Sequence, residues 1–204
     1  MTLTALVNNA LRRLGEERIN DISDSAPRAV MAAELWPNTR DEVLADHEWT
    51  IALRRRSLAE INVENLTPYQ HIYRLPMEPH CLRVLNLIDD GGRAIRPEVG
   101  RYIIEGRNLA TDIAPCRIRY IARVEDVTGY DPMLIEAMAL KLASKLAYAL
   151  SQNPQLEQNM LAQYVAVITV AKGRNSEESW QGYREDASWD QIGKRPVRRK
   201  GWHE

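Results

Sequence analysis

One stretch of the chain decides its fold: residues 131–154 read DPMLIEAMALKLASKLAYALSQNP. Asp131 and Pro132 form a helix start, because an aspartate accepts hydrogen bonds from free backbone amides and proline suits the first helical position. The residues that follow are apolar almost all round the predicted helix. Alanines, which let neighbouring helices approach closely, stand at positions 137, 139, 143, 147 and 149. We therefore expect this helix to be the centre of a bundle.

A last helix is predicted to begin at Asn153 and Pro154, which repeat the cap-plus-proline signal. One face of it is lined by Leu156, Met160, Tyr164, Ile168 and Ala171. The β-branched run 165–170 would also suit a strand, but its continuity with the capped start favours a helix.

Two more helices are predicted near the N-terminus. The apolar positions of the first and its glycine stop are Leu3, Leu6, Val7, Ala10, Leu11, Leu14 and Gly15. The second begins near Ser25, with Asp24 and Ser25 as capping groups and Pro27 in the first turn, and continues to about residue 47. Because Pro37 removes a backbone hydrogen bond and clashes with the preceding turn, we expect a kink or break there.

Between the helical segments the pattern changes to short β-prone runs, from about residue 67 to residue 123. The sequence 89–92, Asp-Asp-Gly-Gly, is a hairpin signal because its glycines accept positive φ, and 105–108, Glu-Gly-Arg-Asn, is a second one. The predicted class is α+β, mainly α: a helical bundle with an inserted antiparallel β-sheet or small sandwich and an extended C-terminal arm. The predicted segments are N-terminal bundle helices 1–66, β insertion 67–125, C-terminal bundle helices 126–173 and arm 174–204.

Composition excludes several classes of protein. The chain of 204 residues has 27 Lys and Arg against 28 Asp and Glu, so a global attraction for phosphate or anionic lipid is not expected. Met133 to Leu150 is the most apolar stretch, but charged residues interrupt it, which argues against a membrane span: Glu136, Lys141 and Lys145. No secretory signal is recognised, which predicts folding in a cytoplasm. Cys81 and Cys116 are expected to be buried thiols on two strands.

No catalytic constellation can be assembled from the sequence. His47-Glu48-Trp49-Thr50-Ile51 begins like the zinc-protease motif HExxH but has Ile51 in place of the second histidine. Neither a nucleotide-binding loop nor a nucleophile elbow is present. Adjacent acids at 89–90 and 177–178 are more typical of solvated turns and helix ends than of a glycosidase pair. We predict no enzymatic activity and no cofactor or metal.

Two basic clusters remain as candidate sites. The first, Arg54, Arg55 and Arg56, could contact phosphates or a neighbouring subunit. The second lies in the polar arm, which also holds three of the five tryptophans. The candidate docking residues of the arm are Trp180, Trp189, Arg195, Arg198, Arg199, Lys200 and Trp202. Because tryptophans bury large areas on partner surfaces, this cluster favours docking to a protein over DNA.

The order of short motifs resembles one known family. The N-terminal pieces are Asn9-Ala10-Leu11, Leu14-Gly15, Asp24-Ser25, Trp36-Pro37, Arg40-Asp41 and His47-Glu48-Trp49, ending in Arg54-Arg55-Arg56-Ser57-Leu58-Ala59. The later pieces are Tyr73-Arg74-Leu75-Pro76, Cys81-Leu82-Arg83-Val84, Ile104-Glu105-Gly106-Arg107, Tyr120-Ile121-Ala122-Arg123-Val124 and Asp131-Pro132. Over roughly residues 3–172 this order is similar to that of the head-to-tail adaptors (tail tubular protein A) of short-tailed double-stranded-DNA bacteriophages.

The resemblance implies a structural virion protein, assembled in the host cytoplasm, of which twelve copies form a ring in the neck of the particle. The ring would lie beneath the portal protein, and DNA would pass through its centre. The bundle would contact neighbouring subunits, the β insertion would project toward the next tail component, and the C-terminal arm would reach the portal.

Two other hypotheses remain open at this point. The chain could be a helical nucleic-acid-binding protein that uses Arg54–Arg56 and the C-terminal cluster, in which case its affinity should fall steeply with salt. It could also be a small hydrolase associated with a phage tail, which would need a catalytic constellation that we do not find.

Overall fold

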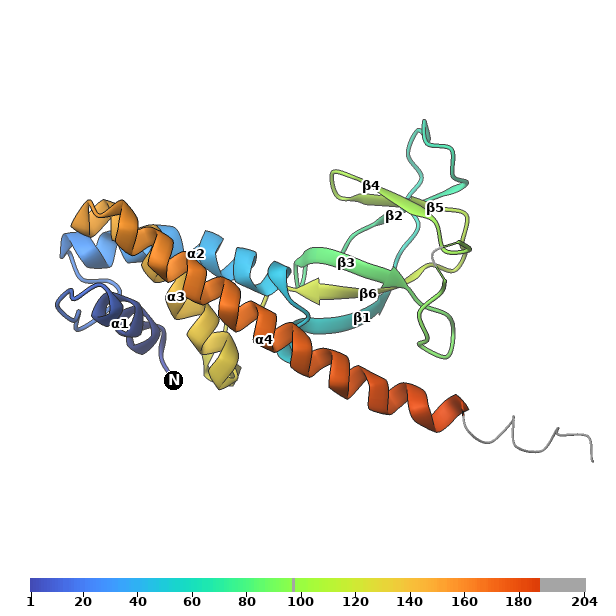
Figure 1. Ribbon diagram of the computed structural model, residues 1–204. Coiled ribbons are helices and arrows are strands. Elements are labelled where there is room, and N and C mark those ends of the chain that lie inside the picture. The colour runs from blue at the N-terminus through green and yellow to red at the C-terminus, as the bar shows by residue number, and fades with distance from the viewer. Residues whose placement is uncertain (97, 188–204) are drawn as a thin grey trace, which may run out of the picture.

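The computed structural model describes residues 1–96 and 98–187, with side chains as far as residue 173. It places a helical bundle beside two three-stranded antiparallel sheets (Figure 1), which confirms the α+β, mainly α, class. The helices are α1 Leu3–Arg13, α2 Pro27–Asp46, α3 Pro132–Ser151 and α4 Pro154–Ala187. The strands are β1 Leu53–Ser57, β2 His71–Arg74, β3 Cys81–Leu87, β4 Tyr102–Glu105, β5 Asn108–Thr111 and β6 Arg117–Ala122. The short turns η1 Thr50–Ala52 and η2 Val127–Gly129 precede β1 and α3.

Helix α3 is the centre of the bundle, as its composition predicts. It packs against α1, α2 and α4, and its buried side chains join the larger of the two hydrophobic cores. The Asp131 carboxylate accepts hydrogen bonds from the N–H groups of Met133 and Leu134, both at 2.9 Å. The Asn153 side chain caps α4 in the same way. Both predicted helix starts are therefore confirmed.

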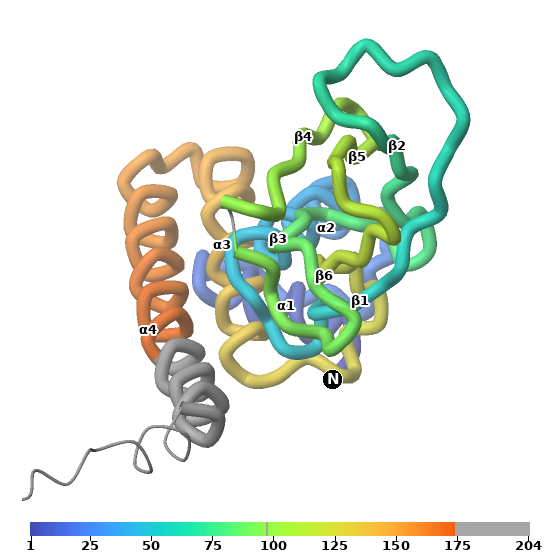
Figure 2. The backbone as a smooth tube through the Cα atoms, turned by 90° about the vertical axis from the view of Figure 1, so that its right-hand side faces the viewer, coloured from blue at the N-terminus to red at the C-terminus, as the bar shows by residue number. Residues whose placement is uncertain are grey.

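The strands form two sheets, with the orders β1-β6-β3 and β2-β5-β4. Figure 2 shows the two sheets one above the other, with the bundle behind them. A second, smaller core fills the space between them and includes Ile118 and Tyr120 from β6 and Leu109 from β5. Cys81 and Cys116 lie in this core as free thiols, and burial raises their pKa values to about 11 and about 12. The expectation of two buried thiols is confirmed.

Helix α2 differs from the prediction in its capping and in the absence of a break at Pro37. It runs without a break through Pro37. The ring of Pro37 is exposed, and the buried residues Trp36 and Thr39 anchor the helix on either side, so packing outweighs the lost hydrogen bond. Neither Asp24 nor Ser25 caps the helix, because its N-cap is Ala26 with no side-chain hydrogen bond. The Asp24 carboxylate instead accepts hydrogen bonds from backbone N–H groups within the preceding loop.

The β region also differs from the prediction. It begins at Leu53, inside the segment 1–66 that was assigned to helices, because β1 pairs with β6. The turn at 89–92 forms, with the Asp89 carboxylate accepting a hydrogen bond from the N–H of Arg93, but only an isolated bridge between Ile88 and Ala94 follows. The second hairpin signal is confirmed: β4 and β5 pair up to Glu105 and Asn108, with Gly106 at φ +60°.

Helix α4 is longer than expected. The sequence predicts an extended arm after Gly173, but the helical backbone continues to Ala187 (Figure 1). The residues after 173 include helix formers such as glutamate, glutamine and arginine, so their sequence is compatible with a helix. Of the candidate docking residues, Trp180 lies on this helical backbone. The others lie outside the described residues: Trp189, Arg195, Arg198, Arg199, Lys200 and Trp202.

Candidate functional site

The outward face of α4 exposes several apolar side chains. Its inward face is buried against the bundle through Met160, Tyr164, Ile168 and Ala171. The opposite face, at 100° per residue, is centred on Ala162, Val165, Ala166 and Thr169, with Leu161 at one edge and Val170 at the other, and the exposed Lys172 follows it. Leu161, Val165 and Val170 are 41%, 55% and 52% exposed, and no charged residue occurs from Leu161 to Ala171. A solvent-facing helix usually carries charges on this side, so the face is typical of an interface.

Polar contacts fix α4 on the bundle and so hold this outward face in place. The hydroxyl of Tyr164 donates a hydrogen bond of 2.5 Å to the Asp46 carboxylate at the end of α2. The ammonium group of Lys141 lies 4.9 Å from the centre of the Tyr164 ring. Burial, followed by the bond to Asp46, raises the pKa of Tyr164, so the hydroxyl remains a donor. Glu42 on α2 accepts a hydrogen bond from Lys145 of α3 at 2.6 Å.

The predicted cluster Arg54–Arg56 does not form one patch. The three residues lie on β1, where successive side chains point to opposite faces of the sheet. Arg54 and Arg56 stand opposite Tyr120 and Ile118, on the side of the second sheet. The Arg54 guanidinium donates to the carbonyls of Ile51 and Leu53, and that of Arg56 donates to the carbonyl of Glu78. These two arginines cap nearby backbone carbonyls.

Arg55 belongs to a different group, on the other face of the same sheet. It stands directly opposite Arg119, and Ser57 stands opposite Arg117. We call Arg55, Arg117 and Arg119 the arginine face. Arg117 and Arg119 are not among the residues predicted from the sequence, although their Arg-Ile-Arg alternation is a signal that both point to one side of a strand. That Arg55 joins them depends on the pairing of β1 with β6, which the sequence does not reveal.

Two carboxylates lie against the arginine face. Arg119 donates a hydrogen bond of 2.8 Å to Glu48, and Arg117 forms an ion pair with Asp90. Arg55 is exposed and makes no side-chain hydrogen bond or ion pair with a described residue. The face therefore carries three positive charges and two negative ones, so it keeps a net positive charge.

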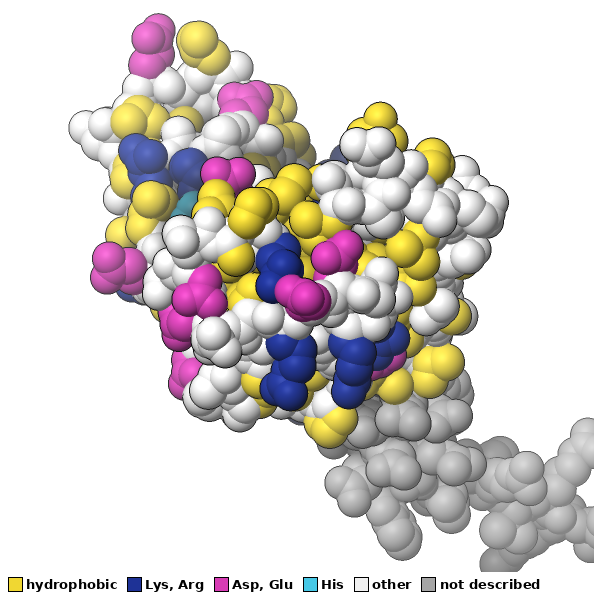
Figure 3. All heavy atoms as spheres, turned by 90° about the vertical axis from the view of Figure 1, so that its left-hand side faces the viewer, with side chains coloured by type: hydrophobic (Ala, Val, Ile, Leu, Met, Phe, Trp, Pro, Cys, Tyr) yellow, Lys and Arg dark blue, Asp and Glu magenta, His cyan; other side chains and the backbone are white. Residues whose placement is uncertain are grey.

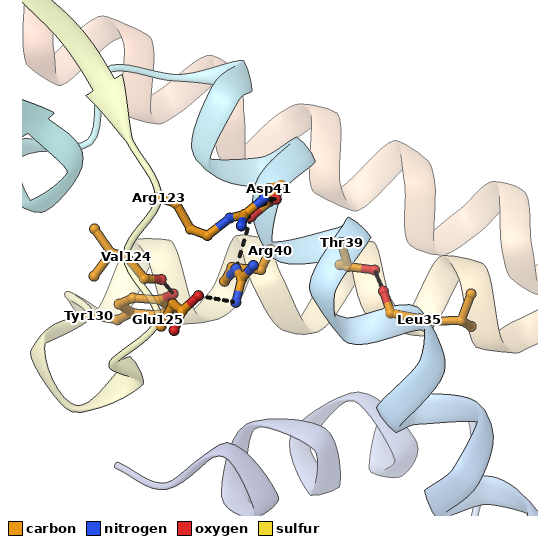
Figure 4. Close-up of polar contacts among 8 residues, drawn as sticks. All are labelled: Leu35, Thr39, Arg40, Asp41, Arg123, Val124, Glu125 and Tyr130. Carbon is orange, nitrogen blue, oxygen red and sulfur yellow. Dashed lines mark hydrogen bonds and ion pairs between the residues drawn. The ribbon is translucent and has the colours of Figure 1, made fainter. Parts of the chain in front are cut away.

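A charge cluster joins the bundle to the sheets (Figure 4). The Asp41 carboxylate on α2 accepts hydrogen bonds from Arg123, which follows β6, and from Arg40, which is buried beside it. Arg40 also lies 4.0 Å from Glu125, and the Tyr130 hydroxyl donates to the carbonyl of Val124 at 2.7 Å. All charges of the cluster are engaged within the chain, so we interpret it as structural.

The far end of the bundle carries no area of a single charge sign. Figure 3 shows basic and acidic side chains interspersed there. Arg13 pairs with Glu136 at 2.6 Å and Arg28 with Glu17 at 2.9 Å. This end is therefore a poor candidate for a binding site of strongly charged ligands.

His47, the first residue of the truncated HExxH motif, is buried. Its ring packs edge-on against Trp49, with 4.7 Å between the ring centres, and the Trp49 indole N–H donates to the Val43 carbonyl. Burial is the main cause that lowers the pKa of His47. Among the described residues no group of three histidine, cysteine or acidic side chains is placed to hold a metal ion. None of the helices in the same residues is long and apolar enough to span a membrane.

Comparisons with known proteins give no family. No protein-family model matches the chain, and no curated protein matches it significantly. A functional proposal therefore depends on the order of motifs in the sequence and on the two exposed surfaces, the outward face of α4 and the arginine face.

Proposed function

We propose that the chain is a structural protein of a phage particle, a head-to-tail adaptor of which about twelve copies form a ring between the portal and the next tail component. The motif order of residues 3–172 and the bundle with its β insertion support this proposal. DNA would pass through the ring, and the segment after Gly173 would reach the portal. No step of this role needs catalysis or a cofactor.

The observation that carries the proposal is the uncharged outward face of α4. A ring closed by rotation uses two different complementary faces on each subunit. The outward face of α4 has the apolar and small side chains that suit one of them, and they stand on a helix that the bundle holds firmly. An apolar face of this kind gains stability when another subunit removes it from water.

The test is a single charge placed on this face. Val165→Glu should prevent ring formation with the portal, because burying the new carboxylate at the contact is costly. Since Val165 is 55% exposed, the subunit itself should fold normally. The matched control is Val99→Glu, the same substitution at a 70% exposed position in the β region. Electron microscopy of each variant mixed with the portal, together with sedimentation analysis, gives the readout.

We expect rings from the wild type and from Val99→Glu, and free subunits from Val165→Glu. Rings formed equally well by Val165→Glu would remove α4 from the contact. Failure of the wild type to assemble on the portal at all would refute the adaptor function.

A further inference from the structure

We infer that the arginine face binds the phosphodiester backbone of double-stranded DNA, without sequence preference. The inference goes beyond the proposed ring, because a single subunit should show the binding. If the ring is correct, this face is the one that turns toward the DNA.

The first support is the arrangement of the three guanidinium groups. Arg55 and Arg119 stand directly opposite each other on neighbouring strands, and like charges in that position destabilise a sheet. Arg117 lies two residues before Arg119 on β6, about 6.8 Å from it in strand geometry. Glu48 and Asp90 relieve part of this repulsion, and a phosphate beside Arg55 would relieve the rest. A guanidinium group binds phosphate oxygens through two parallel hydrogen bonds.

The second support is what surrounds these side chains. None of the large, strongly exposed hydrophobic residues among those described lies on β1, β3 or β6. Ser57 and Asn86 lie in register with Arg117 and Arg119 on this face, and the apolar Leu53 and Ile121 farther along it are packed into the bundle core. A protein partner usually anchors on apolar or aromatic groups, whereas contacts to a nucleic-acid backbone are charged and polar. The composition of the face therefore favours DNA over an acidic protein segment.

The third support is the pair of carboxylates. Glu48 and Asp90 already occupy Arg119 and Arg117, and both are exposed enough to move aside. A phosphate must compete with them, so each contact is weak and exchanges readily. Weak contacts of this kind hold a duplex close to the surface without stopping its movement along it.

Binding can be measured by fluorescence anisotropy with a labelled duplex of arbitrary sequence. Three phosphate contacts predict that the affinity of the wild type falls about 40-fold between about 50 and 200 mM salt. Replacing Arg55, Arg117 and Arg119 by glutamine should remove the salt dependence that these three phosphate contacts produce. The matched control replaces three exposed arginines elsewhere by glutamine, namely Arg12, Arg18 and Arg74.

Two single variants guard against effects on folding. Arg55→Gln removes a side chain with no partner among the described residues and should weaken binding while the unfolding temperature stays the same. Glu48→Gln frees Arg119 and should strengthen binding. The inference is overturned if the triple variant binds like its control, or if a polyglutamate peptide binds the wild type more tightly than the duplex does. Subunits that bind DNA through this face but never form rings would refute the ring alone.

Discussion

Asp41 shows how one side chain can determine the contact between two parts of a chain. Its carboxylate accepts hydrogen bonds from Arg123 and from Arg40, whose side chain is only 10% exposed. Without that carboxylate, Arg40 would remain buried with Glu125 as its nearest anion, at 4.0 Å. A buried charge that loses its partner costs more than the pair itself contributes.

We predict that Asp41→Asn lowers the free energy of unfolding by about 3 kcal/mol. Glu42→Gln, at the next position, breaks more exposed pairs with Lys145 and Lys141 and should cost less than about 1 kcal/mol. Urea denaturation of both variants measures the difference. Equal losses would show that the buried cluster is no more important than a surface ion pair.

Capping residues show what single positions in a sequence can predict. Asp131 and Asn153 are each followed by proline and cap their helices as expected, because the cap and the proline signal coincide at one boundary. Asp24 fails as a cap because its carboxylate finds closer N–H groups at Asn20 and Asp21. Competition between local partners is not visible in the sequence.

At the scale of elements, glycines have opposite roles in two places. Gly173 lies inside helix α4 with no atom within 4 Å of the position of an added Cβ, whereas Gly106 adopts φ +60° in the β4–β5 turn. The sequence suggests a stop at Gly173, because glycine commonly ends helices. A glycine in the interior of a helix only weakens it, and helix formers on both sides allow α4 to continue.

We predict that Gly173→Ala increases helix content and stabilises the chain by about 0.5–1 kcal/mol. Gly106→Ala should instead destabilise the chain by about 1–2 kcal/mol. Alanine would have to adopt the left-handed backbone conformation at this position, which its Cβ disfavours. Circular dichroism during thermal unfolding compares the two variants. A loss of helix content in Gly173→Ala would mean that the helix ends at this residue, as the sequence suggests.

Strand pairing was the element-scale feature that the sequence could not provide. Helices α3 and α4 are recognisable because their apolar periodicity is local. Strand β1, Leu-Arg-Arg-Arg-Ser, has no apolar alternation, and it pairs with β6, whose residues lie 60 to 68 positions farther along the chain. The arginine face arises from that pairing, so it could not be predicted from either segment alone.

The whole molecule combines a rigid bundle with a small two-sheet unit, and the predicted class described this correctly. If the subunits form a ring through heterologous contacts, each copy has two different faces, and we propose the outward face of α4 as one of them. A subunit damaged on one face would still bind a normal neighbour through the other and would block closure of the ring.

We therefore predict that Val165→Glu has a dominant-negative effect on ring closure when it is mixed with wild-type subunits. With a tenth of the subunits replaced, only roughly 30% of twelve-membered rings would contain no variant. Counting closed rings by electron microscopy as the variant fraction rises tests this. A decrease merely proportional to that fraction would indicate pairwise association instead of a closed ring.

The length of α4 has a mechanical consequence. At about 1.5 Å per residue its 34 residues span about 51 Å, against about 30 Å for the 20 residues of α3. In a continuous helix each added residue moves the far end along the axis and also rotates it by about 100°. Inserting two residues would turn the far end almost half-way round, whereas inserting seven would nearly restore its azimuth. If the far end of α4 docks on a partner, we expect changes in its length to be tolerated only in steps close to whole turns.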